Sequence, residues 1–434
     1  MKLMSKLALA AVLTTGVAGT ALVEPAIAQK KKDDKAAPGL KLTPAVQKPA
    51  AEVQKALAAN DVATAETQLV AAETAAAAGN DDDKYIAAAL RLDLEQAKLR
   101  AAQQANPNAP VNQGTLAKPL ETLIANPRTP PASLPQFNFI RGSLALNAQQ
   151  YAVAVPYLER ARQLGYVNPD LDVTIAQAKL QGGDVRGGLA DLDASIARKT
   201  AAGEKAPESY YRVGIQRANA AKMGPETLTW LKKWVAAYPT SKNWRDVVFV
   251  YGLQPTSIAK LDNQQQIDLW RLLRASRALA DQYDYREYAQ KVFDRGLPAE
   301  AATVLKEGTA AGKLAGNADA ASLMSAAQQR VRVDTPLATL STQAKASANG
   351  KLAAQTGDAY LGQDSYTQAA ELYRLALQKG GVNADEVNTR LGIALARSGD
   401  KAGAQAAFGA VTPTGPRAEI AQLWTTWLNA PPSA

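Results

Sequence analysis

Small and apolar residues recur along this chain at spacings that place them on one face of a helix. Ala369, Tyr373 and Ala376 are spaced i, i+4 and i+7, and Gly357 lies 12 residues before Ala369. The same order returns roughly 35 residues later, at Gly392, Ala404, Phe408 and Val411. The pattern therefore predicts pairs of antiparallel helices joined by short turns.

Further copies of this pattern occur throughout the chain, with a period of roughly 34 residues. They begin at Val62, Gly142, Ala176 and Ala289. Small residues let two helices approach to about 8 Å, and the larger residue between them fills the remaining groove. We therefore predict an all-α fold, a right-handed α-solenoid of about eight or nine helical hairpins.

The pattern resembles the tetratricopeptide repeat. The family's small and large positions are matched by two sets of residues: Gly142, Ala154, Leu158 and Ala161, and Gly357, Ala369, Tyr373 and Ala376. The family's early tryptophan and most of its closing prolines are missing, so the repeats are degenerate. The resemblance implies stacked hairpins with a concave groove that binds a protein or peptide.

The repeat register also predicts where the array is irregular. The proline-rich stretch near 104–135 and the segment near 252–263 interrupt the period. We therefore expect N-terminal repeats over 45–252 and C-terminal repeats over 253–434. A last helix over 416–429 carries an apolar stripe that includes Trp424 and is expected to cap the open end of the array.

The N-terminus has the features of a secretory signal. Lys2 and Lys6 precede an apolar stretch, and Ala26-Ile27-Ala28 provides small residues for cleavage after Ala28. We expect 1–28 to be removed, 29–44 to form a disordered basic tether, and no transmembrane span in the mature chain. With no cysteine for disulfides or a lipid anchor, the sequence predicts an exported protein of a Gram-negative periplasm.

Composition excludes most forms of catalysis. The chain has no cysteine and no histidine, so thiolate, serine–histidine and Cys/His zinc chemistry are absent. Cleavage of the signal would lower the net charge from +9 only to +8, and that charge is dispersed, which argues against nucleic-acid binding. The basic tether predicts at most weak contact with anionic surfaces. We assign no catalytic residue, cofactor or metal, and predict a protein that is not an enzyme.

Three features of the sequence could form a binding or catalytic site or could have a purely structural role. The tryptophans between Trp230 and Trp270 could line a glycan site, but large rings that fill irregular repeats are the favoured explanation. Arg271, Arg274 and Arg277 share a helical face that could receive an acidic partner, although a solvated face is favoured. Glu208-Ser209 is similar to the catalytic pair of lytic transglycosylases, but a helix N-terminal charge is the favoured explanation.

The resemblance also implies which residues line a concave face. The matching positions are Phe139, Ser143, Gln177, Gln181, Asp358 and Arg397. The predicted function is a protein–protein interaction scaffold or adaptor of the bacterial cell envelope. The alternative is a glycan- or peptidoglycan-related binding protein, or the accessory of an exported enzyme. A helical glycosidase is disfavoured because the 34-residue register argues against a closed toroid.

Overall fold

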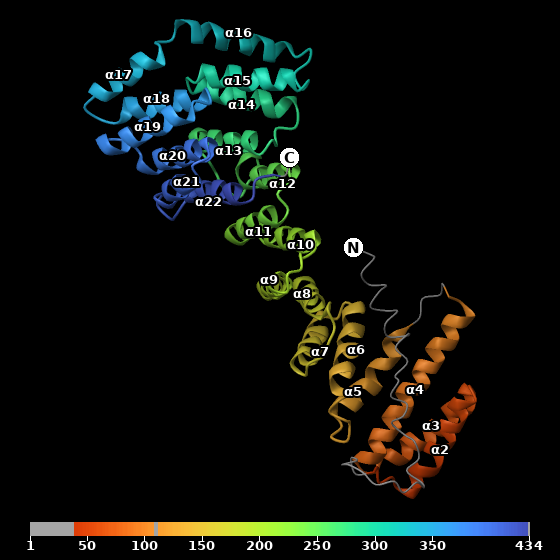
Figure 1. Ribbon diagram of the computed structural model, residues 1–434. Helices are drawn as coiled ribbons and strands as arrows, with labels where there is room; N and C mark the ends of the chain where they lie inside the picture. The colour runs from red at the N-terminus through yellow and green to blue at the C-terminus, as the bar shows by residue number, and fades with distance from the viewer. Residues whose placement is uncertain (1–38, 108–111, 433–434) are drawn as a thin grey trace. The chain divides into compact units, whose positions relative to one another are not determined.

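The computed structural model describes residues 39–107 and 112–432 (Figure 1). Their regular structure is helical, and no strand occurs among them. This confirms the predicted all-α class. The chain divides into two compact units, Met1–Gly203 and Glu204–Ala434, which are described separately. The predicted signal and residues 29–38 of the predicted tether lie outside the described residues. Residues 39–44 of that tether are not disordered, because the backbone N–H groups of Lys41 and Thr43 donate to Asp82 and Asp83 and Pro44 begins the first described helix.

The first unit consists of helices that pack against their neighbours in chain order. They are α2 Pro44–Ala58, α3 Val62–Ala77, α4 Asp81–Ala105, the 3₁₀ turn η2 Gln113–Leu116, α5 Ala117–Ala125, α6 Leu134–Asn147, α7 Tyr151–Gln163, α8 Leu171–Gly182 and α9 Val185–Ala201. Helix α5 lies inside the predicted proline-rich insertion. It buries Leu120 and Leu123 and packs between α4 and α6, so this stretch is part of the array.

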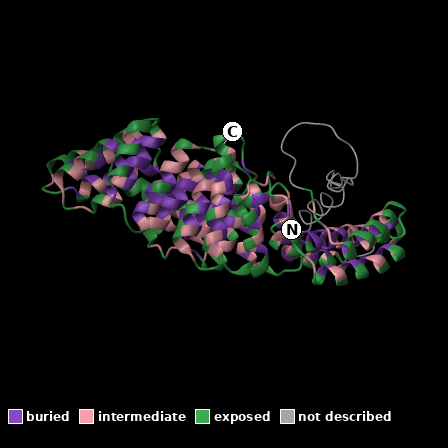
Figure 2. Cartoon of the chain, turned by 90° about the horizontal axis from the view of Figure 1, so that it is seen from below, coloured by how far each residue is buried: buried purple, intermediate pink, exposed green. Residues whose placement is uncertain are grey.

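The second unit contains the remaining helices. They are α10 Glu208–Ala220, α11 Gly224–Ala237, α12 Ser241–Val248, the π-turn η3 Phe249–Leu253, α13 Asn263–Ala275, α14 Gln282–Asp294, α15 Pro298–Ala310, α16 Ala318–Val333, α17 Leu337–Ala346, α18 Lys351–Gly362, α19 Tyr366–Lys379, α20 Ala384–Ser398, α21 Lys401–Gly409 and α22 Pro416–Asn429. Buried residues concentrate on the helix faces turned toward other helices (Figure 2).

The small residues of the repeat allow the two helices of a hairpin to approach closely, as the sequence pattern predicts. A Cβ added at Gly142 would lie 2.7 Å from Leu158 Cγ, and one at Gly357 would lie 2.9 Å from Tyr373 Cε1. Ala369 and Ala376 are completely buried. Each glycine therefore admits the large residue of the next helix into close contact, which fixes the α6–α7 and α18–α19 hairpins.

The same contact occurs in a repeat that the sequence reading missed. Gly214 on α10 faces the ring of Trp230 on α11, and any Cβ at Gly214 would overlap that ring. Gly214 and Trp230 are 16 positions apart in the sequence, as Gly142 and Leu158 are. A tryptophan at the large position disguises the repeat in the sequence, because the other repeats have leucine, tyrosine or phenylalanine there.

The boundary between the two units falls after Gly203, whereas the register predicted a division at 252/253. The difference arises because the segment before 253 packs onto the C-terminal helix. The Tyr251 hydroxyl donates a 2.8 Å hydrogen bond to Glu419 Oε2 of α22. Contacts of this kind, between residues far apart in sequence, leave no trace in a local repeat register.

Helix α22 has the predicted bounds but a larger role than an end cap. It covers α20 and α21, as a cap would, and it also packs against α11 and α13. The indole N–H of Trp424 donates to the backbone oxygen of Asp268, 156 residues earlier, at 3.2 Å. The last helix therefore caps the final hairpin, as expected, and in addition joins the end of the second unit to helices nearer its beginning.

Candidate functional site

Helix α13 lies at the centre of the second unit. Its N-terminus is fixed by a capping box, in which Asp262 and Gln265 exchange side-chain-to-backbone hydrogen bonds. The seven consecutive residues 267–273 are buried, so the helix is enclosed on all sides. Two of these seven residues, Asp268 and Arg271, are charged, and burying a charge is costly unless it is paired.

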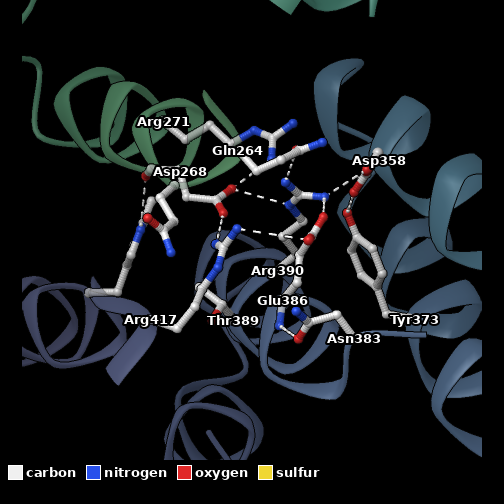
Figure 3. A network of polar contacts seen from close by, with 12 residues as sticks. Gln264, Asp268, Arg271, Asp358, Tyr373, Asn383, Glu386, Thr389, Arg390 and Arg417 are labelled. Carbon is white, nitrogen blue, oxygen red and sulfur yellow. Dashed lines mark hydrogen bonds and ion pairs between the residues drawn. The ribbon is translucent and has the colours of Figure 1, made fainter. Parts of the chain in front are cut away.

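Asp268 is the focus of a buried charge network (Figure 3). Its carboxylate is fully buried, and it accepts from Arg271 at 2.9 Å, from Arg390 at 3.3 Å and from Arg417. Burial alone would raise the pKa of Asp268. The positive charges of Arg390, Arg417 and Arg271 outweigh that effect and lower its pKa to about 2. Asp268 is therefore ionised throughout the physiological pH range.

The arginines around Asp268 each have a further carboxylate partner. Arg271 forms a bidentate pair with Glu300 of α15, at 2.9 and 2.7 Å. Arg390 of α20 donates to Asp358 of α18 at 2.8 Å and to Glu386 at 2.5 Å. The network thus joins α13 to α15, α18, α20 and α22.

Two buried tyrosines complete the network. Tyr288 donates to Glu300 at 2.6 Å, and Tyr373 donates to Asp358 at 2.7 Å. Burial, followed by the neighbouring carboxylate, raises the pKa of each phenol well above its usual value. Both tyrosines therefore remain protonated donors. Because its charges are matched within the chain, we interpret this network as the clasp that closes the unit.

A small cavity adjoins the clasp between α13, α18, α20 and α22. Arg274, Glu300, Tyr366, Arg397 and Trp424 contribute to its walls, and its volume is about 20 Å³. That volume accommodates about one water molecule. The cavity is therefore too small for an organic substrate.

The larger concavity of the second unit is a surface groove of about 730 Å³. We call it the α15–α18 groove, because its walls come from the start of α15, the end of α16, the start of α17, and α18. Its apolar residues include Leu337, Leu340, Leu352 and Tyr360, and its polar residues include Arg332, Gln355 and Gln363. The volume lies within the range of ligand-binding pockets, about 300–1,000 Å³.

Four of the six predicted partner-binding residues lie in the first unit. Phe139 is 7% exposed and stacks on Tyr166 with ring centroids 4.5 Å apart, so it is a core residue. Ser143 is 8% exposed, and its hydroxyl has no hydrogen-bond partner among the described residues. On α8, Gln177 is exposed and Gln181 is half-buried. Of these four, Gln177 is therefore the residue most accessible to a partner.

The other two predicted residues lie in the second unit, close to the clasp. Asp358 belongs to the charge network, and Arg397 lines the small cavity and stacks on the ring of Tyr366 at 5.2 Å. Neither these two nor the four in the first unit line the α15–α18 groove. The turn at Gly296-Leu297-Pro298 was visible in the sequence, but nothing local indicated that it borders a groove.

The structure shows whether the three candidate features named in the sequence analysis form sites or have structural roles. Trp230, Trp234, Trp244 and Trp270 are 0–4% exposed, which confirms that they fill the core. The expectation that the arginine stripe is solvated is wrong for Arg271 and Arg274. Arg271 is 6% exposed and belongs to the clasp, and Arg274 pairs with Glu307 and Asp364.

Glu208 has the structural role that was favoured for it. It is the first residue of α10, where a carboxylate interacts favourably with the helix dipole. Its Oε1 accepts from the Trp234 indole N–H at 2.9 Å and from the Asn243 amide at 3.3 Å. These contacts tie α10 to α11 and α12.

The described residues contain neither a cluster of metal ligands nor a helix that could span a membrane. Within 39–107 and 112–432, no three carboxylates gather in an arrangement that could hold a metal ion. In the same ranges, no helix combines the length and the apolar character needed to cross a bilayer.

Comparisons with known proteins leave the family open. No family model matches the chain, and no curated protein matches it. Among solved structures, the pentatricopeptide repeat protein PPR10 from maize matches with 13% identity and a TM-score of 0.24, over 87% of this chain. The chain covers 61% of that protein, less than two thirds of its length. A TM-score this low carries no argument, so the helical-repeat description rests on the contacts given above.

Proposed function

We propose that this protein is an exported scaffold of the bacterial cell envelope that binds a protein partner and does not catalyse a reaction. The α15–α18 groove carries the proposal, because it is a concavity of binding-site size with apolar walls and a polar edge. Repeat arrays of helical hairpins use extended surfaces of this kind to hold partners. The proposal places the partner in this groove and not at the buried clasp.

The alternative of glycan binding was based on the tryptophans between Trp230 and Trp270, and the structure does not support it. The tryptophans of α11, α12 and α13 are core residues, so their rings are not available to stack on a sugar. Export to the periplasm is proposed from the N-terminal sequence alone. It predicts that the mature protein begins at Gln29, which mass spectrometry of the protein purified from its host would test.

Site-specific photo-crosslinking in intact cells tests the scaffold proposal. A photoreactive residue would replace Gln355, which is exposed and lines the groove, in the full-length chain. A second position, Gln177, probes the exposed surface predicted in the first unit. The matched control is Ala402, an exposed position on α21 away from the groove lining.

We expect one protein to be captured reproducibly from Gln355 and not from Ala402. Capture from Gln177 and not from Gln355 would indicate that the partner binds the first unit, and it would still support the scaffold proposal. If neither position captures a protein, the scaffold proposal fails.

A further inference from the structure

We propose that the α15–α18 groove receives a short peptide segment of a partner protein, with apolar anchor residues flanked by acidic side chains. This inference rests on the scaffold proposal and adds the chemistry of the partner to it. Three features of the groove support it: the apolar side chains that line it, the poor burial of α16 and α17, and the sign of the nearby charges.

Apolar side chains of α17 and α18 line the groove. Leu337, Leu340, Leu352, Ala359 and Tyr360 are half-buried in the described structure. Removal of such apolar side chains from water favours association. The occupant must therefore supply apolar side chains of its own.

Helices α16 and α17, which contribute to the lining of the groove, bury few of their own residues. Ala344 is the single buried residue of α17, and α16 buries Ala320 and Ala327. Near the end of α16, Val331 is 40% exposed and Val333 is 81% exposed. Val331 lines the groove, so an occupant would cover part of this exposed apolar surface.

The lining of the groove and the residues next to it in sequence together carry more unpaired cations than unpaired carboxylates. Arg332 lines the groove, and the exposed Arg295 and Lys351 directly adjoin lining residues in sequence. None of these three cations has an ion-pair partner among the described residues. The carboxylate of Glu300 is held by Arg271, which leaves Asp334 as the one unpaired acidic group among the lining residues. This balance favours an acidic peptide over a basic one, because opposite potentials attract across an interface.

Peptide selection against the full chain tests this assignment. Random peptides displayed on phage would be enriched on the purified protein, and each enriched peptide would be measured by fluorescence anisotropy. We expect the enriched peptides to combine leucine-like or aromatic residues with Asp or Glu. A version of each peptide with Lys in place of Asp and Glu serves as the charge-reversed probe.

Two exposed arginines provide matched variants. Arg332→Glu changes the groove, whereas Arg374→Glu makes the same charge change on the exposed surface of α19. We expect Arg332→Glu to weaken binding of the acidic peptide by roughly tenfold, which corresponds to about 1.4 kcal/mol. It should strengthen binding of the charge-reversed peptide, and Arg374→Glu should change neither affinity.

Several results would overturn the assignment. Enrichment of basic or uncharged peptides would do so, as would equal effects of the two arginine variants. Crosslinks from Gln355 to a second copy of this chain would replace the peptide with self-association. The scaffold proposal fails separately, when neither Gln355 nor Gln177 captures a partner in cells. Capture of a partner at Gln355 through a segment without acidic residues would refute only the acidic peptide.

Discussion

Replacement of Asp268 by asparagine tests whether the clasp closes the second unit. The change keeps the size of the side chain and removes one negative charge at the point where three arginines converge. Arg271 would keep Glu300, and Arg390 would keep Asp358 and Glu386. Arg417 would keep only Glu386, at 4.0 Å. The variant therefore leaves a buried positive charge with little compensation.

Two estimates give the size of the effect. Lowering of the Asp268 pKa from 3.8 to about 2 corresponds to about 2 kcal/mol of stabilisation of the folded state. Removing one member of a buried ion pair costs about 3–5 kcal/mol. We expect Asp268→Asn to lower the free energy of unfolding of the second unit by about 2–4 kcal/mol at pH 7.

Tryptophan fluorescence is the appropriate assay. All six tryptophans lie in the second unit, so denaturant unfolding followed by their emission reports on that unit. Because the folded-state pKa of Asp268 is lowered, its stabilisation is present above about pH 4 and is lost as pH falls toward 2. The difference in stability between wild type and variant should therefore shrink over that window.

The control is Asp246→Asn, which removes an exposed i, i+4 pair with Lys242. Its effect should stay within about 0.5 kcal/mol, as is usual for exposed pairs. A loss below about 1 kcal/mol for Asp268→Asn would refute the clasp. So would a loss of the same size at pH 7 and near pH 2, because it could not come from the Asp268 charge.

Three further substitutions test the packing and the first unit. Gly214→Ala should destabilise the second unit by about 1–3 kcal/mol, because the added methyl group overlaps the Trp230 ring. The control Gly409→Ala places a methyl group in open space and should not destabilise the unit. Unfolding followed by tryptophan fluorescence measures both effects. Ala369→Leu should cost about 1–3 kcal/mol in the same assay, because Ala369 is fully buried against the neighbouring helix. Burial raises the pKa of Asp93 to about 6, so its ionisation costs stability as pH rises from 4 to 6. Asp93→Asn should therefore stabilise the first unit by up to about 3 kcal/mol at pH 8 and by little at pH 4, measured by circular dichroism. Equal effects at both pH values would contradict this reasoning.

The repeat was readable from sequence because its contacts are local. Gly357 and Tyr373 belong to consecutive helices of one hairpin, so their spacing is fixed by helix geometry and a short turn. A small residue must recur wherever a large one enters from the next helix, and this leaves a period in the sequence. The same rule failed at Gly214 only because the large partner was a tryptophan.

The arginine stripe of α13 was misread for the opposite reason. A charged residue every three or four positions is typical of a solvated face, and nothing near Arg274 in sequence indicates a partner. Its partners, Glu307 and Asp364, are 33 and 90 residues away. Ion pairs between residues so far apart in sequence form only when the whole unit is folded, so a local sequence pattern cannot predict them.

The sequence by itself determined the helical class, most of the hairpins, the bounds of the last helix and the exclusion of cysteine and histidine chemistry. All of these follow from composition and from contacts between residues within one repeat. The tertiary structure decided that α22 closes the second unit, that Asp268 lies at the centre of a buried clasp, and that a groove opens between α15 and α18. Each of these depends on small rotations between successive hairpins, which add up over many repeats.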